Sequence, residues 1–366
     1  MLNLLDFFAS DVLLTVFFVV GLELVEELKN GDLGDLKRAS LPALAAIGGI
    51  IVPAAIYLLV VHFASVRGEF MHGWAIPTAT DVAFSLVVLQ FFKHKLRSGV
   101  KLFLMVLAVV DDIIGIVIIA LVYSGGRGVA VPEVLLVVVL VTFWAVLLRH
   151  LKNIESSFNQ VVAKAALVLL ACSVWLFVLK SGVHPTIAGV ILGLTTPATV
   201  EADGTSLATR LVKLFGPFNN LVVVPIFAVV SIVVSGAQMF NTSPAYANSV
   251  TSYELTVVVF AVVFGLVVGK PLGILLFAWI GSHLTPLELF HGLRVRNLVG
   301  AALLGGIGFT VSFLIAALSF SNELVVAFAR LGVLVGSLMS ATAGSAFIYF
   351  TTRTTRKTAT SVENAV

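Results

Sequence analysis

The sequence predicts an all-α polytopic membrane protein, and three observations support that prediction. Of the 366 residues, 59% are hydrophobic and only 11% are charged, with a mean hydropathy of +1.11. A soluble domain carries roughly a quarter charged residues, so this composition excludes a soluble globular enzyme. Apolar runs long enough to cross a bilayer follow one another and lack the alternation of a membrane barrel. The predicted spans are therefore helices.

The hydropathy of the chain predicts about eleven transmembrane helices within residues 1–350. The first apolar run leads directly into others without a signal-peptide cleavage site, which predicts membrane insertion rather than secretion. The predicted spans are 11–28, 41–62, 74–92, 99–123, 132–149, 161–180, 183–198, 218–237, 253–281, 297–319 and 322–350.

Basic residues predict the orientation of these spans. About sixteen of the 22 Lys and Arg residues fall in alternate loops and in the tail, whereas the opposite loops hold Arg67 and Arg127. The basic side is the cytoplasmic one, which predicts an external N-terminus and a cytoplasmic C-terminus. The tail 351–366 is rich in Thr, Arg and Lys without an apolar period, and we expect it to be disordered.

Two spans carry helix-breaking residues in the middle. In the third span, Pro77 removes a backbone donor, and Thr78, Thr80 and Asp81 compete for backbone hydrogen bonds. In the tenth, glycines at positions 300, 305, 306 and 308 interrupt the helix. Unwound backbone at membrane depth is tolerated only where it is buried in protein or lines a water-filled cavity. Each break therefore marks a candidate site.

The two broken spans occupy matching places in the chain. Each is second in a triplet of spans, at approximately 41–123 and 253–350. The tenth span comes seven spans after the third, and this odd offset reverses the membrane orientation of the second triplet. The sequence therefore predicts inverted-topology repeats whose discontinuous helices cross near the bilayer midplane, an arrangement typical of secondary transporters.

Four ionisable residues lie near the middle of apolar spans. Asp111 and Asp112 stand deep in the fourth span, Asp81 lies in the break of the third, and Lys270 lies within the ninth. Neighbouring helical residues point about 100° apart, so Asp111 and Asp112 cannot both face one partner. A purely structural ion pair would explain one aspartate. Three carboxylates against one ammonium require a further cation or protons, which favours a functional role.

The charge balance predicts ion exchange. Hard oxygen ligands suit Na⁺ or Li⁺, and Thr80 can add a neutral ligand beside the carboxylates of Asp81, Asp111 and Asp112. Protons and metal ions then compete for one site. An intramembrane aspartyl hydrolase, with Asp81 and Asp112 as its dyad, and a passive cation channel remain the alternatives. No G-x-x-x-x-G-K-[ST] loop occurs, so we expect no ATP-driven pumping. The preferred interpretation as an ion exchanger implies no enzyme activity and no cofactor besides the transported Na⁺ or Li⁺ and protons.

The sequence resembles the NhaA family of bacterial Na⁺/H⁺ antiporters over nearly its whole length. Seven short motifs stand in the same order and at the same places among the spans as in that family. They are Phe17-Phe18-Val19-Val20-Gly21-Leu22-Glu23 with Glu27, Ala45-Ala46-Ile47-Gly48-Gly49 before Val52-Pro53-Ala54, Ala79-Thr80-Asp81-Val82-Ala83-Phe84, Asp111-Asp112, Leu179-Lys180-Ser181-Gly182-Val183-His184, Gly269-Lys270-Pro271-Leu272-Gly273 and Gly306-Ile307-Gly308-Phe309-Thr310-Val311-Ser312.

This resemblance implies a role for each residue of the constellation. Asp112 is expected to be the principal ion and proton carrier, and Asp111 to pair with Lys270. Thr80 and Asp81 are expected at the crossing of the broken helices. The resemblance further implies electrogenic, pH-regulated exchange in the bacterial inner membrane. The family normally has another helix and an external hairpin that helps it dimerise before the Glu23 span, whereas Met1 stands just before that span here, so a homodimer stays open.

The resemblance also assigns Glu23, Glu27 and His184 to a pH-sensing, cytoplasm-facing funnel and its surroundings. Glu23 and Glu27 lie one turn apart on one helix face, but near a helix end they could equally pair with Lys29 or with solvent. His184 could be an ordinary interfacial histidine. After Leu24 the family has basic residues where this chain has Val25 and Glu26, which predicts a shifted pH response.

Overall fold

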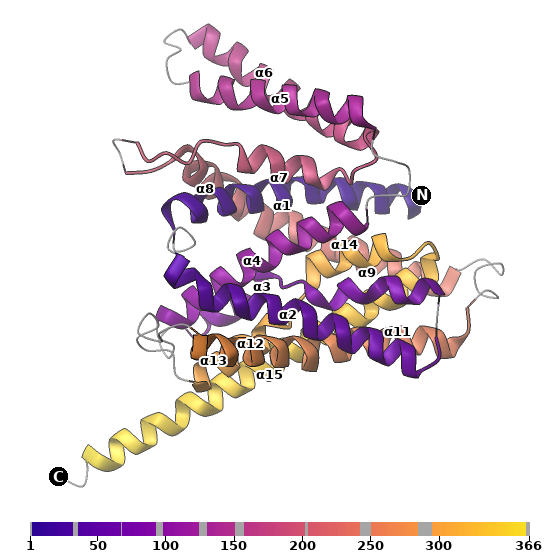
Figure 1. The fold of residues 1–366 in the computed structure, drawn as a ribbon, viewed down its shortest axis with the longest axis vertical. Helices are drawn as coiled ribbons and strands as arrows, with labels where there is room; N and C mark the ends of the chain where they lie inside the picture. The colour runs from indigo at the N-terminus through magenta and orange to yellow at the C-terminus, as the bar shows by residue number, and fades with distance from the viewer. Residues whose placement is uncertain are drawn as a thin grey trace. The chain divides into compact units, whose positions relative to one another are not determined.

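A computed structural model gives the fold, and it contains two compact helical units (Figure 1). It describes residues 2–31, 36–66, 68–92, 98–123, 130–150, 157–201, 204–241, 250–284 and 295–363. The first unit comprises Met1–Asp35 and Ile116–Ser231, and the second comprises Leu36–Gly115 and Ile232–Val366. Most of both predicted triplets therefore belongs to the second unit.

The first unit is built from α1, the α5–α6 hairpin and the segments that follow. Its elements are α1 (Leu2–Asn30), α5 (Val131–His150), α6 (Ser157–Lys180), α7 (Thr186–Leu194), α8 (Leu207–Phe218), the π-helix η4 (Asn219–Val223) and the start of α9 (Val224–Asn241). α1 and α7 pack closely because glycines face backbone: a Cβ on Gly189 would lie 2.4 Å from the Leu14 carbonyl oxygen, and one on Gly21 would lie 2.6 Å from that of Val190.

The second unit holds both broken helices. Its elements are α2 (Leu36–Phe63), the 3₁₀-helix η2 (Gly68–Thr78), α3 (Val82–Gln90), most of α4 (Ser98–Val122), the end of α9, α11 (Ser252–Phe264), the π-helix η5 (Gly265–Gly269), α12 (Lys270–Leu284), α13 (Val295–Gly305), α14 (Phe309–Ser319) and α15 (Glu323–Glu363). Its apolar core contains side chains from α2, α4, α12 and α13, including Phe103, Leu104 and Ile274.

Both predicted breaks are present. The third span is divided into η2 and α3 by Ala79, Thr80 and Asp81, which are not helical. The tenth is divided into α13 and α14 by Gly306, Ile307 and Gly308, and its halves are bent by 42°. The predicted cause, proline and competing polar side chains in one span and glycine in the other, falls at these positions.

The number of spans is less settled than their class. Among the described residues, seven helices are long and apolar enough to cross a membrane, and the bent α13–α14 pair makes eight. The other predicted spans fall on α1, whose side chains are described from Leu14 onward, on η2 with α3, and on the nine-residue α7. The total of eleven and the inverted repeats therefore stay predictions.

The tail differs from its prediction. α15 continues to Glu363, so the described part of segment 351–366 is helical rather than disordered. Extending an existing helix adds one hydrogen bond for each residue ordered and needs no new nucleus. The span that ends near residue 350 can therefore extend its helix into polar sequence.

Candidate cation site

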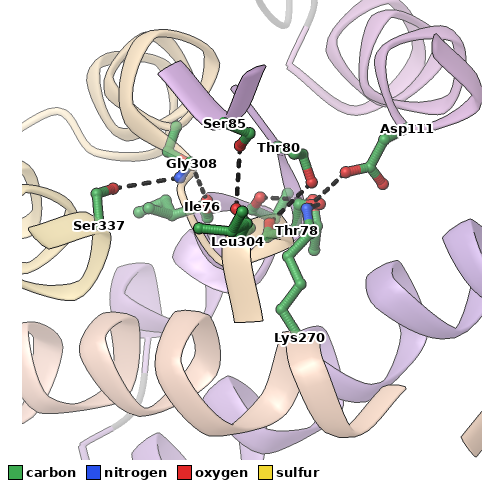
Figure 2. A network of polar contacts seen from close by, with 12 residues as sticks. Ile76, Thr78, Thr80, Ser85, Asp111, Lys270, Leu304, Gly308 and Ser337 are labelled. Atoms are coloured by element: carbon green, nitrogen blue, oxygen red, sulfur yellow. Dashed lines mark hydrogen bonds and ion pairs between the residues drawn. The ribbon is translucent and has the colours of Figure 1, made fainter. Parts of the chain in front are cut away.

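The two helix breaks contact each other through backbone groups and hydroxyls (Figure 2). The Asp81 backbone N–H donates to the Ile307 carbonyl at 2.6 Å, and the Thr80 hydroxyl donates to the Gly305 carbonyl at 2.9 Å. One turn along α3, the Ser85 hydroxyl donates to the Leu304 carbonyl at 3.0 Å. Carbonyls left without helical donors at the end of α13 thus find donors on the other broken span. We call this region the crossing.

Asp81 caps two helices at once. Its Oδ1 accepts from the Phe84 backbone N–H at 3.1 Å, at the start of α3. Its Oδ2 accepts from the backbone N–H and the hydroxyl of Thr310, at 3.2 and 2.8 Å, in the first turn of α14. Helix N-termini carry partial positive charge, so one buried carboxylate compensates two of them. Both oxygens are engaged in this capping, which disfavours a catalytic dyad with Asp112.

Lys270 joins a helix end to an aspartate. Its ammonium donates to the Thr78 carbonyl, at the C-terminal end of η2, and to Asp111 Oδ2 at 2.6 Å. The side chains of both Lys270 and Asp111 are fully buried. The partial negative charge of a helix C-terminus and the carboxylate both favour a cation at this point. Asp111 Oδ1 is buried and has no hydrogen-bond partner among the described residues.

Asp112 is placed differently from its neighbour. It follows Asp111 on α4 and is partly exposed, whereas Asp111 is 2% exposed. This difference follows from the roughly 100° turn between consecutive helical residues. The structure therefore separates the pair into a buried partner of Lys270 and a carboxylate with access to its surroundings.

The expected metal ligands do not form a closed cage. No group of three or more His, Cys, Asp or Glu side chains suited to a metal exists in the part of the chain that the structure describes. The Thr80 hydroxyl donates its proton to Gly305, yet its oxygen lone pairs can still face a cation. An ion here would be bound by one or two carboxylates with hydroxyl, carbonyl and water oxygens, which is compatible with its release.

The three pH-sensing candidates are not brought together. Glu23 is exposed on α1 and Glu27 lies one turn beyond it. His184 lies in the turn before α7, where one ring nitrogen contacts the Thr186 hydroxyl at 2.8 Å. The first half of α7 packs beside Leu14 of α1, and the end of α7 packs beside Leu22 of α1. His184 is therefore at the opposite end of this helix pair from the two glutamates.

Sequence reasoning gave Glu26 no role of its own, although it joins α1 to α8. Its carboxylate accepts from the Ser206 hydroxyl at 2.5 Å and from the Asn30 amide at 2.9 Å. Ser206 also caps α8 by accepting from the Thr209 N–H, and Asn30 donates to the Ala198 carbonyl. Ser206 is a residue type common at helix starts, but nothing local pointed to a partner 180 residues away.

Ser337 is a second residue that sequence reasoning missed. Its hydroxyl accepts from the Gly308 N–H at 3.2 Å and supports the break from α15. A serine within an apolar helix gives little signal, because most such hydroxyls bond to their own helix. On the other side of the break, the Ser312 hydroxyl donates to the Ile76 carbonyl at 2.6 Å.

Comparison with known proteins identifies similar sequences. The chain matches the family model described as Na⁺/H⁺ antiporter 1 over residues 2–348. A protein of Bifidobacterium breve named Na(+)/H(+) antiporter NhaA is 40% identical over 360 residues, covering 91% of this chain and 72% of the relative. A protein of the same name from Citrobacter koseri is 38% identical over 343 residues, covering 93% and 82%.

Proposed function

The chain belongs to the Na⁺/H⁺ antiporter 1 family, and we propose that Na⁺ or Li⁺ competes with protons for its aspartates at the crossing. It is a multi-pass protein of the bacterial inner membrane, a secondary transporter that exchanges sodium for protons and not an enzyme. The observation that carries the proposal is the buried Lys270–Asp111 ion pair with Asp112 beside it on α4.

Competition follows from the charges of these residues. Asp112 is the carboxylate that is not buried, so it is the group that accepts either a metal ion or a proton. A cation that approaches Asp112 also attracts Asp111, whose Oδ1 has no partner in the described structure. Bound metal disfavours protonation of either carboxylate, and protonation expels the metal. One site can then carry Na⁺ in one direction and protons in the other.

The crossing supplies the means of alternating access. Asp81 caps two half-helices that begin in the break region, and Lys270 contacts the end of a third. A change of charge on Asp111 alters the attraction that holds Lys270 and, through Lys270, η2. Loading or unloading the site therefore biases the arrangement of the helices around it. Electrogenic exchange, with more protons than sodium ions moved per cycle, is part of this proposal.

Two alternatives are not favoured. An aspartyl hydrolase would need two carboxylates sharing a proton, but both oxygens of Asp81 accept hydrogen bonds from helix starts. A passive channel would show no proton coupling, whereas the relatives are named as antiporters.

The decisive experiment is collapse of a preformed pH gradient by Na⁺ or Li⁺ in inside-out vesicles, followed with a dye. We expect collapse with the wild-type chain and none with Asp112→Asn at any pH. Glu254→Gln, which changes a partly exposed carboxylate in the capping box of α11, serves as the matched control and should retain exchange. Inserted, folded wild-type protein that never responds would refute the antiporter proposal for this chain.

The orientation and the pH response are finer parts of the proposal. We place the N-terminus outside and the C-terminus in the cytoplasm, so a cysteine near residue 358 in a Cys172→Ser background should react with an impermeant maleimide only in inside-out vesicles. Reaction in intact cells would show the opposite orientation.

We assign pH sensing to Glu23, Glu27 and His184. Glu27→Gln should move the activity profile along the pH axis, and an unchanged profile would remove it from that role.

Homodimerisation is proposed on the resemblance alone. Cross-linking in native membranes, followed by the apparent mass on a denaturing gel, tests it. A product of twice the monomer mass is expected, and a monomer at every cross-linker concentration would contradict it.

A further inference from the structure

Ser340 on α15 has a buried hydroxyl that bonds to nothing in the described part of the chain. The residue is 1% exposed, and its Oγ has no hydrogen-bond partner there. Hydroxyls inside helices usually donate to the carbonyl four residues earlier, as Thr342 does to Leu338 at 2.9 Å. Ser340 points instead at Gly306, where an added Cβ would lie 2.5 Å from its Oγ. The hydroxyl thus faces the break between α13 and α14.

The Leu266 carbonyl converges on the same point. A Cβ added to Gly306 would also lie 2.5 Å from the Leu266 carbonyl oxygen, so the two oxygens are no more than twice that distance apart. Leu266 lies in the π-helix η5, where the N–H five residues later would normally bond to its carbonyl. That residue is Pro271, which has no N–H, and the Lys270 N–H donates to Gly265. The donor that a π-helix would normally supply to this buried oxygen is therefore missing.

One helix end beside Gly306 is electronegative. Gly306 follows directly after α13, and the C-terminal end of a helix carries partial negative charge. One turn before Ser340, Ser337 accepts from the Gly308 N–H, so α15 lines this side of the break. Ser337 and Asp111 stand on opposite sides of the crossing in Figure 2. The Ser337 side of the break is therefore apart from Asp111.

We propose that the Ser340 hydroxyl and the Leu266 carbonyl bind a Na⁺ or Li⁺ ion beside Gly306, as a second cation site on the α15 side of the crossing. Both ligands are hard, neutral oxygens, which alkali cations accept and which cannot trap the ion as a carboxylate would. Waters or break carbonyls complete its coordination. The site is a transient stop on the ion's way to or from Asp112. The inference rests on the proposed exchange function.

The test compares Ser340→Ala and Ser340→Cys with the wild type in the vesicle assay, over a range of Na⁺ and of Li⁺ concentrations. Removing one neutral ligand should raise the apparent KM for both ions by about threefold to tenfold while the maximal rate stays near wild type. Cysteine keeps the size but replaces a hard ligand with a soft one, so it should behave like alanine. The Na⁺ to Li⁺ preference should change as well.

Ser235→Ala is the matched control. Ser235 is also a buried serine in the second unit, 6% exposed, whose Oγ has no partner among the described residues, but it lies on α9. Its substitution should leave both KM values unchanged. If Ser340→Ala lowers only thermal stability, with KM and ion preference intact, the hydroxyl binds a structural water and the cation site is refuted. Failure of the wild type to exchange would instead refute the antiporter function.

Discussion

At the scale of single residues, the interaction between Lys270 and Asp111 carries a large electrostatic cost. Both side chains are fully buried, and the ammonium has a carboxylate at 2.6 Å and a helix-end carbonyl as partners. Taking two charges out of water costs several kcal/mol for each ion, which their attraction repays only with good geometry. The pair is therefore sensitive to the loss of either member.

We predict that Asp111→Asn lowers the unfolding free energy by about 3–5 kcal/mol, because it leaves the Lys270 ammonium buried without a carboxylate. Asp111→Asn combined with Lys270→Gln should recover much of that loss, since no buried charge remains unbalanced. Thermal unfolding of the purified protein in detergent measures both. Glu201→Gln, which breaks the more exposed Arg210–Glu201 pair, should cost about 1 kcal/mol or less. Equal destabilisation by the single and double variants would contradict this account.

At the scale of elements, η5 determines where Lys270 lies. A π-helix takes an extra residue into its turn and redirects the side chains that follow. η5 ends at Gly269, and α12 begins with Lys270. The close approach of α2 to this segment depends on glycine: a Cβ on Gly269 would lie 2.8 Å from Pro53 Cα, and one on Gly273 would clash with the Gly48 carbonyl. The packing of α2 against η5 and α12 thus sets the reach of the lysine.

Gly269→Ala should move η5 away from α2 and shift Lys270 from Asp111. A displacement of about 1 Å at a site of this kind can cost up to a hundredfold in rate, so we expect the maximal exchange rate to fall by about tenfold or more. Gly236→Ala is the control, because an added Cβ there meets nothing within 4 Å. It should keep the rate and gain up to about 1 kcal/mol of stability. Equal rates for the two variants would show that this contact does not position the lysine.

At the scale of the whole molecule, the balance of buried charge links sodium to protons. Asp81, Asp111 and Asp112 face the positive charge of Lys270 and two helix starts. Asp81 is compensated by the helix starts and Asp111 by the lysine, and we propose that Asp112 binds whichever transported cation is present. Exchange is then a property of the assembled second unit and not of any single helix.

Competition at one site predicts the form of the pH dependence. As the pH falls, protons occupy Asp112 more often, so the apparent KM for Na⁺ should rise, by up to about tenfold per pH unit for each proton displaced. The maximal rate at saturating Na⁺ should change much less. Initial rates over a grid of pH and Na⁺ concentration in inside-out vesicles measure both quantities. A pH effect confined to the maximal rate would mean that protons act at a separate regulatory site.

Much of this architecture could be predicted from local patterns. Composition and apolar run length predicted membrane helices, because a bilayer core excludes unpaired backbone and charge. The breaks at Thr80 and at Gly306 were visible as residues that disfavour a helix, and both are present. The helical tail beyond residue 350 was not predicted, because its extension depends on the helix that precedes it rather than on its own polar composition.

The sequence by itself determined the membrane class, the position of the two breaks and the four ionisable residues whose buried charges must be balanced. These features depend on composition and on neighbours in the chain. Only the tertiary structure decided that Asp81 caps α3 and α14 together and that Leu266 and Ser340 converge on Gly306, whereas the Lys270–Asp111 contact was expected from the family resemblance. Lys270 and Asp111 are 159 residues apart, and Asp81 and Thr310 are 229 apart. Contacts over such separations depend on how helices pack, and no local pattern in the chain encodes that packing.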